Sequence, residues 1–252
     1  ESDGITRQLM SITVDGLTQG VLVLWPRGLA PDSGWPVVVF NHGFHPDPPN
    51  YGRIDGVSAR PGKYYWGSVQ AYAENGYVVV VPDYRGHNDS DVQSFSMWHQ
   101  LLNWFSAKMH GVDKLAYWYT RDSIASYFAI IKLPKVNAER VYMAGHSMGG
   151  GITQRSIVAL GGRIKAASIW STTADHMALE THWRSLQVPL LIQHGKGDEV
   201  TSADDSKALA HILEHWGKPH RLILVDTGRH LFSGEEFERA VQNDLEWFAQ
   251  FH

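Results

Sequence analysis

Residues 140–151 read Arg-Val-Tyr-Met-Ala-Gly-His-Ser-Met-Gly-Gly-Gly, and this stretch decides the fold. An apolar run enters it, a glycine-rich turn carries one serine, and an amphipathic segment leaves it. This is Gly-x-Ser-x-Gly in the order strand, tight turn, helix, which is the context that gives the motif meaning. The turn strains the backbone of Ser147, so the residues two positions away must be small, and Gly145 and Gly149 meet that need. The stretch therefore predicts a nucleophilic serine between a strand and a helix.

Segments typical of strands and helices alternate from residue 37 to the end of the chain. Beyond the strand that enters the motif, buried strands are expected at 37–40, 77–81, 166–170, 190–193 and 222–225. Helices are expected at 64–75, 113–131 and 148–160, and after the capping sequences that begin at Ser202 and Ser233. Residues 5–14 and 21–25 indicate an antiparallel hairpin, with Gly16 and Gly20 as breaks. The pattern predicts one α/β domain over residues 1–252, with a mostly parallel, doubly wound sheet of the eight-stranded type.

Residues 88–112 differ from their surroundings because they are rich in aromatic and apolar side chains. The spacing of Trp98, Leu101, Leu102, Phe105 and Met109 is helical. The segment is therefore either a small helical insertion packed into the core or a lid over the pocket. The chain also holds ten tryptophans and ten tyrosines, more than a core of this size needs. We expect some aromatic side chains to line a substrate pocket beside Ser147; the candidates are His146, Trp98, Trp104, Phe105 and Trp170.

The composition excludes several classes of function. The 252 residues include no cysteine, which rules out disulfides, thiol catalysis and thiolate metal sites. The net charge is -4 without a basic patch, which argues against nucleic acid as a partner. There is no apolar window long enough to span a membrane, no His-Glu-x-x-His pattern among the 14 histidines, and no recognisable signal peptide. We expect no cofactor and no metal, and a secreted or periplasmic protein rather than a cytoplasmic one.

A serine hydroxyl needs a base, and the base needs an acid to orient it. In a parallel sheet, functional groups gather at the carboxyl ends of the strands. Asp198 follows the predicted strand at 190–193, and His230 follows the strand at 222–225. The order Ser147, Asp198, His230 is the triad order of α/β-hydrolases. Glu199 and Asp226 are the competing acids.

The oxyanion that forms during acyl transfer requires preorganised N–H donors. We expect one from the backbone of Met148, directly after the nucleophile, and one from Phe44, in the loop after the strand at 37–40. Gly43 would let this loop approach the substrate. His42 and His194 each precede a glycine at a strand end, where a histidine often satisfies backbone groups.

Taken together, these motifs resemble the α/β-hydrolases, and in detail the small serine esterases and acyl hydrolases of the prolyl-oligopeptidase-like (dienelactone-hydrolase-like) branch. The matching segments are 41–44, 76–87, 145–150, 194–198 and the loop of His230. Two features depart from the family. The chain reads Gly86-His87-Asn88 where relatives often have Gly-His-Gly, and the large cap of many relatives between Trp170 and Leu190 is missing.

The resemblance implies a serine carboxylesterase that works through an acyl-enzyme, and the aromatic residues suggest aryl or carbohydrate-linked substrates such as feruloyl or acetyl esters. A peptidase of the same branch is the first alternative, and it would need acidic residues such as Asp47, Asp55 or Glu180 to hold a peptide amine. Only about 36 residues precede the predicted catalytic core, too few for a propeller domain, which counts against a gated peptidase. A non-catalytic binding protein on the same fold is the second alternative. The sequence does not indicate an oligomeric state.

Overall fold

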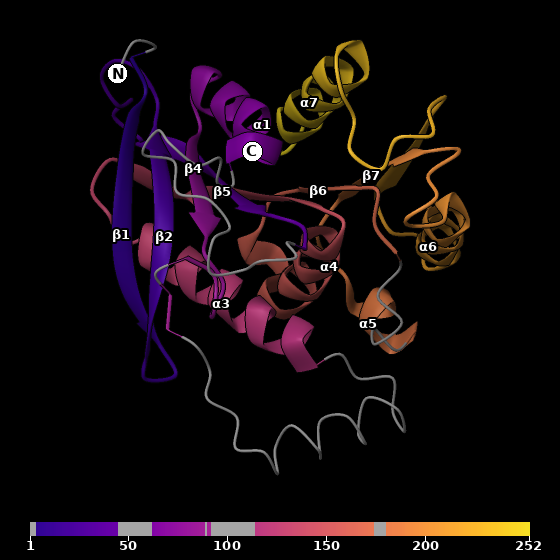
Figure 1. Cartoon of the computed structure of the whole chain (residues 1–252), viewed down its shortest axis with the longest axis horizontal. Helices are drawn as coiled ribbons and strands as arrows, with labels where there is room; N and C mark the ends of the chain where they lie inside the picture. Colours follow the sequence, from indigo (N-terminus) through magenta and orange to yellow (C-terminus); the bar gives the residue numbers. More distant parts are fainter. Residues whose placement is uncertain (1–3, 45–61, 89, 92–113, 174–179) are drawn as a thin grey trace.

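The computed structural model describes residues 4–44, 62–88, 90–91, 114–173 and 180–252 (Figure 1). Within these ranges the strands form one sheet in the order β1-β2-β4-β3-β5-β6-β7-β8. The strands are β1 (Thr6–Val14), β2 (Leu17–Trp25), β3 (Trp35–Asn41), β4 (Val78–Pro82), β5 (Val136–His146), β6 (Ala167–Trp170), β7 (Leu190–Gly195) and β8 (His220–Val225). The helices are α1 (Gly62–Glu74), α3 (Lys114–Ile130), α4 (Met148–Leu160), the 3₁₀ turn η2 (Gly161–Arg163), α5 (Glu180–Ser185), α6 (Ala203–His215) and α7 (Glu235–Phe248). β1, β2 and β4 pair antiparallel and all other neighbours pair parallel, so the predicted fold class is confirmed.

The N-terminal hairpin has a two-residue turn and a longer second strand than predicted. Asp15 and Gly16 both have positive φ, at 54° and 81°, as the tightest hairpin turns require. The sequence placed a break at Gly20, but β2 runs through it from Leu17. A Cβ at Gly20 would lie 3.1 Å from the carboxylate of Asp83, so this glycine lets the end of β4 approach rather than ending the strand.

Apolar layers cover both faces of the sheet, which explains why β3 reads as a continuous apolar run. Val38 and Phe40 pack in the core shared with α1 and α7. Val37 and Val39 pack in the opposite core, shared with α3, α4 and α6. Figure 1 shows α1 and α7 on one side of the sheet and α3, α4, α5 and α6 on the other.

The helix ends and the short helices agree with the sequence analysis only in part. Ser202 caps α6 as predicted, because its side chain accepts the N–H of Asp204 at 3.2 Å. The predicted cap at Ser233 is wrong: Gly234, with φ of 57°, is the N-cap of α7 and makes no side-chain bond. Helix α5 was not predicted, since it has only six residues. The predicted insertion at 88–112 lies outside the described residues except for 88, 90 and 91.

The structure explains why Asn88 can stand where related sequences often have a glycine. Asn88 has φ of 52°, in the left-handed region where glycine is most at ease. Asparagine is one of the few other residues that adopt this region readily. Asn88 therefore keeps the backbone conformation that a Gly-His-Gly sequence would allow.

Helix α7 is joined to the sheet by a buried carboxylate. Asp244 accepts hydrogen bonds from Tyr72 on α1, Ser168 and Trp170 on β6, and Gln193 on β7. Burial raises the pKa of Asp244 to about 7, even though the four hydrogen bonds lower it. The sequence analysis missed this residue because its partners are distant in the chain.

Replacing Asp244 with alanine is expected to lower the free energy of unfolding by about 3 to 5 kcal/mol, because several buried donors lose their acceptor. Asp244→Asn is the matched control, since its carbonyl oxygen can still accept from Ser168, Trp170 and Gln193. The pKa of Asp244 is higher in the folded protein than in the unfolded chain, so the folded protein binds this proton more tightly. The resulting stabilisation is fully present at pH values below the pKa of the unfolded chain, and it is lost as the pH rises through the folded pKa of about 7.

Denaturant unfolding between about pH 5 and about pH 9 should therefore show the Asn variant gaining stability relative to the wild type. An unchanged difference across this range would contradict the assignment, and so would an Ala variant as stable as the wild type.

Candidate active site

Ser147 lies on a strained turn between β5 and α4. Its φ of 55° and ψ of -123° lie in a region of backbone conformation that residues other than glycine rarely adopt. A Cβ at Gly145 would lie 2.3 Å from the carbonyl oxygen of Gly149, and one at Gly149 would lie 2.0 Å from that of Asn41. The need for small residues on both sides of the serine is thus confirmed, and its cause is the close approach of β5, α4 and the end of β3.

A further glycine and a threonine support the same turn, and the sequence analysis did not identify either. The hydroxyl of Thr172, just after β6, donates to the carbonyl oxygen of Ser147 at 2.8 Å. A Cβ at Gly150 would lie 2.6 Å from the Cβ of Thr172. The second glycine after the serine therefore makes room for the side chain that holds the turn.

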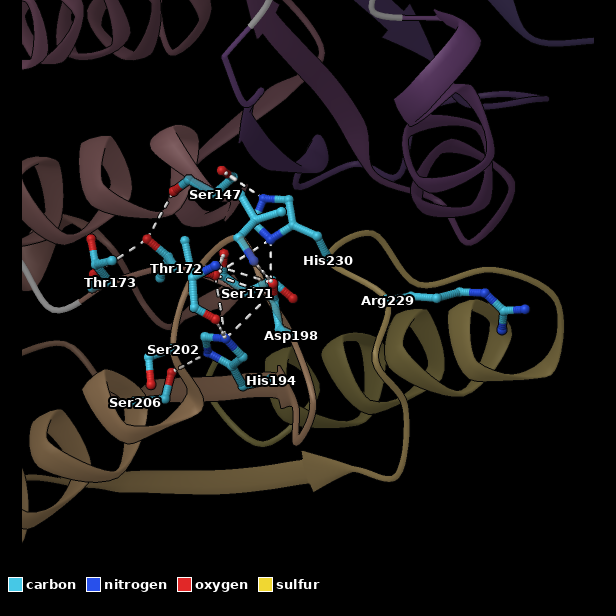
Figure 2. Close-up of polar contacts among 12 residues, drawn as sticks. Ser147, Ser171, Thr172, Thr173, His194, Asp198, Ser202, Ser206, Arg229 and His230 are labelled. Carbon is cyan, nitrogen blue, oxygen red and sulfur yellow. Dashed lines mark hydrogen bonds and ion pairs between the residues drawn. The ribbon is translucent and has the colours of Figure 1, made fainter.

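The three predicted triad residues meet at the carboxyl edge of the sheet (Figure 2). Nε2 of His230 is 2.9 Å from Oγ of Ser147, and Nδ1 of His230 is 2.8 Å from Oδ2 of Asp198. In this arrangement the imidazole can take the proton of the serine hydroxyl, and the carboxylate can stabilise the imidazolium that results.

Asp198 is fixed from several directions. Its Oδ1 accepts the backbone N–H groups of Val200 at 2.8 Å and Thr201 at 3.1 Å, and its Oδ2 faces His230 and the hydroxyl of Thr201. Burial alone would raise the pKa of Asp198, but the hydrogen bonds from His230 and from the two backbone groups lower it overall. The side chain is thus held as a carboxylate.

The competing acids lie elsewhere. Glu199 is exposed, and the side chain of Asp226 is 94% exposed beside Lys196. Nδ1 of His230 donates its hydrogen bond to Asp198, and not to Glu199, the next residue in the sequence.

His194 satisfies backbone and hydroxyl groups, as expected from its place before a glycine. Its Nδ1 contacts the hydroxyl of Ser206 at 2.7 Å, and its Nε2 contacts the carbonyl oxygen of Thr201 at 3.0 Å. The same Nε2 is 3.4 Å from Oδ2 of Asp198, so the imidazole packs behind the acid.

The two backbone groups expected to bind an oxyanion lie at the ends of β3 and β5. Met148 begins α4 directly after Ser147. Phe44 is 71% exposed and follows Gly43, whose own N–H donates to the hydroxyl of Tyr65 at 3.0 Å. Because the N–H of Gly43 is occupied, Phe44 and Met148 remain our proposed donors.

The structure also changes the explanation for Gly43. A Cβ at this position would lie 2.5 Å from the hydroxyl of Tyr65. We expected the glycine to admit substrate, but on that side the space is filled by Tyr65, so the glycine is needed for packing.

The five proposed pocket residues have different outcomes. Trp98, Trp104 and Phe105 lie outside the described residues. Trp170 is 2% exposed, packs against Phe232 and Phe237, and donates its indole N–H to Asp244, so its expected place in the pocket is wrong and it is a core residue. The strand end that carries Trp170 is at the site, but its side chain packs into the core beside α7.

His146, the fifth, is 4% exposed. Its side chain contacts Tyr65 and the backbone of His230, which makes it a buried neighbour of the triad rather than a surface for substrate.

Neither a metal site nor a membrane span was found in the described part of the chain. No group of three or more histidine, aspartate or glutamate side chains there is arranged to hold a metal ion. Among the same residues, no helix is both long enough and apolar enough to cross a membrane.

Comparison with known proteins finds likenesses to proteins that are named as peptidases. The chain is 21% identical over 212 residues to an uncharacterized peptidase of Bacillus subtilis (strain 168), covering 72% of this chain and 75% of that protein. It superposes on dipeptidyl peptidase 4 of Porphyromonas gingivalis with a TM-score of 0.72 at 20% identity, over 98% of this chain but 35% of that one, so it spans about a third of that peptidase's length.

A second solved structure has a similar size. Est1E of Butyrivibrio proteoclasticus, solved with ferulic acid bound, superposes with a TM-score of 0.69 at 17% identity and covers 95% of this chain and 99% of that one. At these identities the solved structures support the fold alone. The family described as alpha/beta hydrolase fold matches residues 36–179, more than half of the chain, and the protein therefore belongs to the α/β-hydrolase family.

Proposed function

We propose that this protein is a serine hydrolase that cleaves carboxylic esters through an acyl-enzyme on Ser147. The observation that carries the proposal is the continuous contact from Oγ of Ser147 through the imidazole of His230 to the carboxylate of Asp198. An intact constellation of this kind also argues against a non-catalytic binding protein.

The reaction follows from the positions of these atoms. Oγ of Ser147 attacks the ester carbonyl carbon while its proton passes to Nε2 of His230, and the oxyanion takes hydrogen bonds from the N–H groups of Phe44 and Met148. The imidazolium then protonates the departing alcohol. Water, deprotonated by the same nitrogen, attacks the acyl-enzyme and releases the carboxylic acid.

The substrate class rests on weaker support. The aromatic residues of the sequence and the likeness to a protein solved with ferulic acid favour aryl or carbohydrate-linked acyl groups. The likeness to two proteins named as peptidases favours the alternative, hydrolysis of short peptides. Of the acidic residues considered for a peptide amine, Asp47 and Asp55 lie outside the described residues.

A panel of matched substrates separates the two activities. p-Nitrophenyl acetate, feruloyl esters and acetylated sugars are compared with aminoacyl-p-nitroanilides, and kcat/KM is measured for each. We expect kcat/KM for the best ester to exceed that for every anilide by at least about a thousandfold, more than the roughly 10- to 200-fold that a single methylene contact in a pocket provides. Faster cleavage of the anilides would support the peptidase and contradict the esterase.

A further inference from the structure

His146 contacts the residue that carries the catalytic base. Its Nε2 is 2.9 Å from the backbone carbonyl oxygen of His230, and the centroids of the two imidazole rings are 4.7 Å apart. His146 is fixed at the end of β5, one residue before the nucleophile. Its side chain therefore ties the His230 loop to the strand that presents Ser147.

Tyr65 extends the same connection to the loop after β3. Its hydroxyl is 2.9 Å from Nδ1 of His146 and accepts the backbone N–H of Gly43 at 3.0 Å. A Cβ at Gly43 would lie 2.5 Å from this hydroxyl and 3.3 Å from Nδ1 of His146. The loop that carries Phe44 thus rests directly on the tyrosine and the histidine.

The hydrogen bonds assign the protons without conflict. A carbonyl oxygen only accepts, so Nε2 of His146 carries the hydrogen that points to His230. In a neutral ring Nδ1 is then an acceptor, and the hydroxyl of Tyr65 donates to it while its oxygen accepts from Gly43.

The imidazole of His146 is neutral at physiological pH. Burial lowers the pKa of His146 to about 4, and the nearby His230 adds to this effect while the hydrogen bond to the carbonyl of His230 opposes it. A neutral ring is needed here because His230 becomes positive during the reaction, and a second positive charge 4.7 Å away would oppose it.

We propose that Tyr65 and His146 form a positioning relay: Gly43 N–H to Tyr65 hydroxyl to His146 imidazole to His230 carbonyl. The relay sets the distance between the proposed oxyanion donor at Phe44 and the base at His230, and it rests on the proposed serine hydrolase function. Neither side chain touches substrate; both act on kcat by holding the reacting groups in register with Ser147.

Three variants test the relay. Tyr65→Phe removes one oxygen, and His146→Leu removes both ring nitrogens. We expect kcat to fall about tenfold to about a hundredfold with little change in KM, because displaced reacting groups lower the rate of the chemical step. His146→Gln keeps an amide N–H that can reach the carbonyl of His230, and we expect it to recover most of the kcat that the Leu variant loses.

The matched control is Tyr142→Phe. Tyr142 is also a buried tyrosine of the core, and its hydroxyl donates to the backbone carbonyl of Phe251 at 2.6 Å, away from the triad. We expect its kcat to stay within about twofold of the wild type, as for a core change that leaves the reacting groups in place. If His146→Leu does not fold, Tyr65→Phe decides the question, with thermal unfolding as the check that it is native at the assay temperature.

The rate of inactivation by a fluorophosphonate probe provides a second readout that needs no knowledge of the substrate. A wild type that does not react would contradict the proposed function. A reactive wild type with a Tyr65→Phe variant of equal rate and kcat would contradict the relay alone. A loss in Tyr142→Phe equal to that in Tyr65→Phe would also contradict it, because the effect would then not be specific to the relay.

Discussion

Replacing Ser147 with alanine is expected to lower kcat for the best ester substrate by about 10⁴-fold to about 10⁶-fold, because the acyl-enzyme can no longer form. The backbone of the turn is strained in either case, so alanine removes only the hydroxyl that lies 2.9 Å from Nε2 of His230. KM should change little, since the binding surface remains. Initial rates with p-nitrophenyl acetate and the mass of the fluorophosphonate-treated protein measure the two consequences.

Ser171→Ala is the matched control. Ser171 follows the neighbouring strand β6, also has positive φ, at 45°, and its buried hydroxyl has no hydrogen-bond partner among the described residues. We expect it to keep kcat within about threefold of the wild type, in line with a residue outside the reacting set. Ester hydrolysis that survives Ser147→Ala at the wild-type rate would show that another group is the nucleophile.

The sequence was informative where the chemistry is local. The elbow could be predicted because Gly145, Ser147 and Gly149 are close in the chain and their spacing reflects one turn. The alternation of strands and helices placed Asp198 and His230 after two strands, and the rule that functional groups gather at strand ends brought them together.

The features that the sequence did not predict depend on contacts between distant residues. Tyr65 and His146 are 81 positions apart, and Tyr72 and Asp244 are 172 apart, so no spacing or motif connects them. Trp170 is one of the aromatic residues that the sequence analysis proposes for the pocket. On a strand, however, successive side chains face opposite sides, and this one faces the core beside Asp244.

Replacing Asp198 with asparagine is expected to lower kcat by about 10⁴-fold at neutral pH. The structure gives a specific reason. Oδ1 of Asp198 accepts the N–H groups of Val200 and Thr201, so the amide oxygen of asparagine will take that position and its NH₂ group will face His230. Nδ1 of His230 must then accept, the ring hydrogen moves to Nε2, and the nitrogen facing Ser147 can no longer take a proton.

Glu199→Gln and Asp226→Asn are the matched controls, because they make the same change at the two acids that the sequence left as competitors and that the structure leaves at the surface. Both should keep kcat within about twofold of the wild type. A pH–rate profile measures all three variants under the same conditions, and the loss in Asp198→Asn should persist from about pH 7 to about pH 9. If Asp226→Asn showed the large loss instead, the orienting acid would be the one after β8, and the hydrogen bond that His230 donates to Asp198 would be only a contact of the resting enzyme.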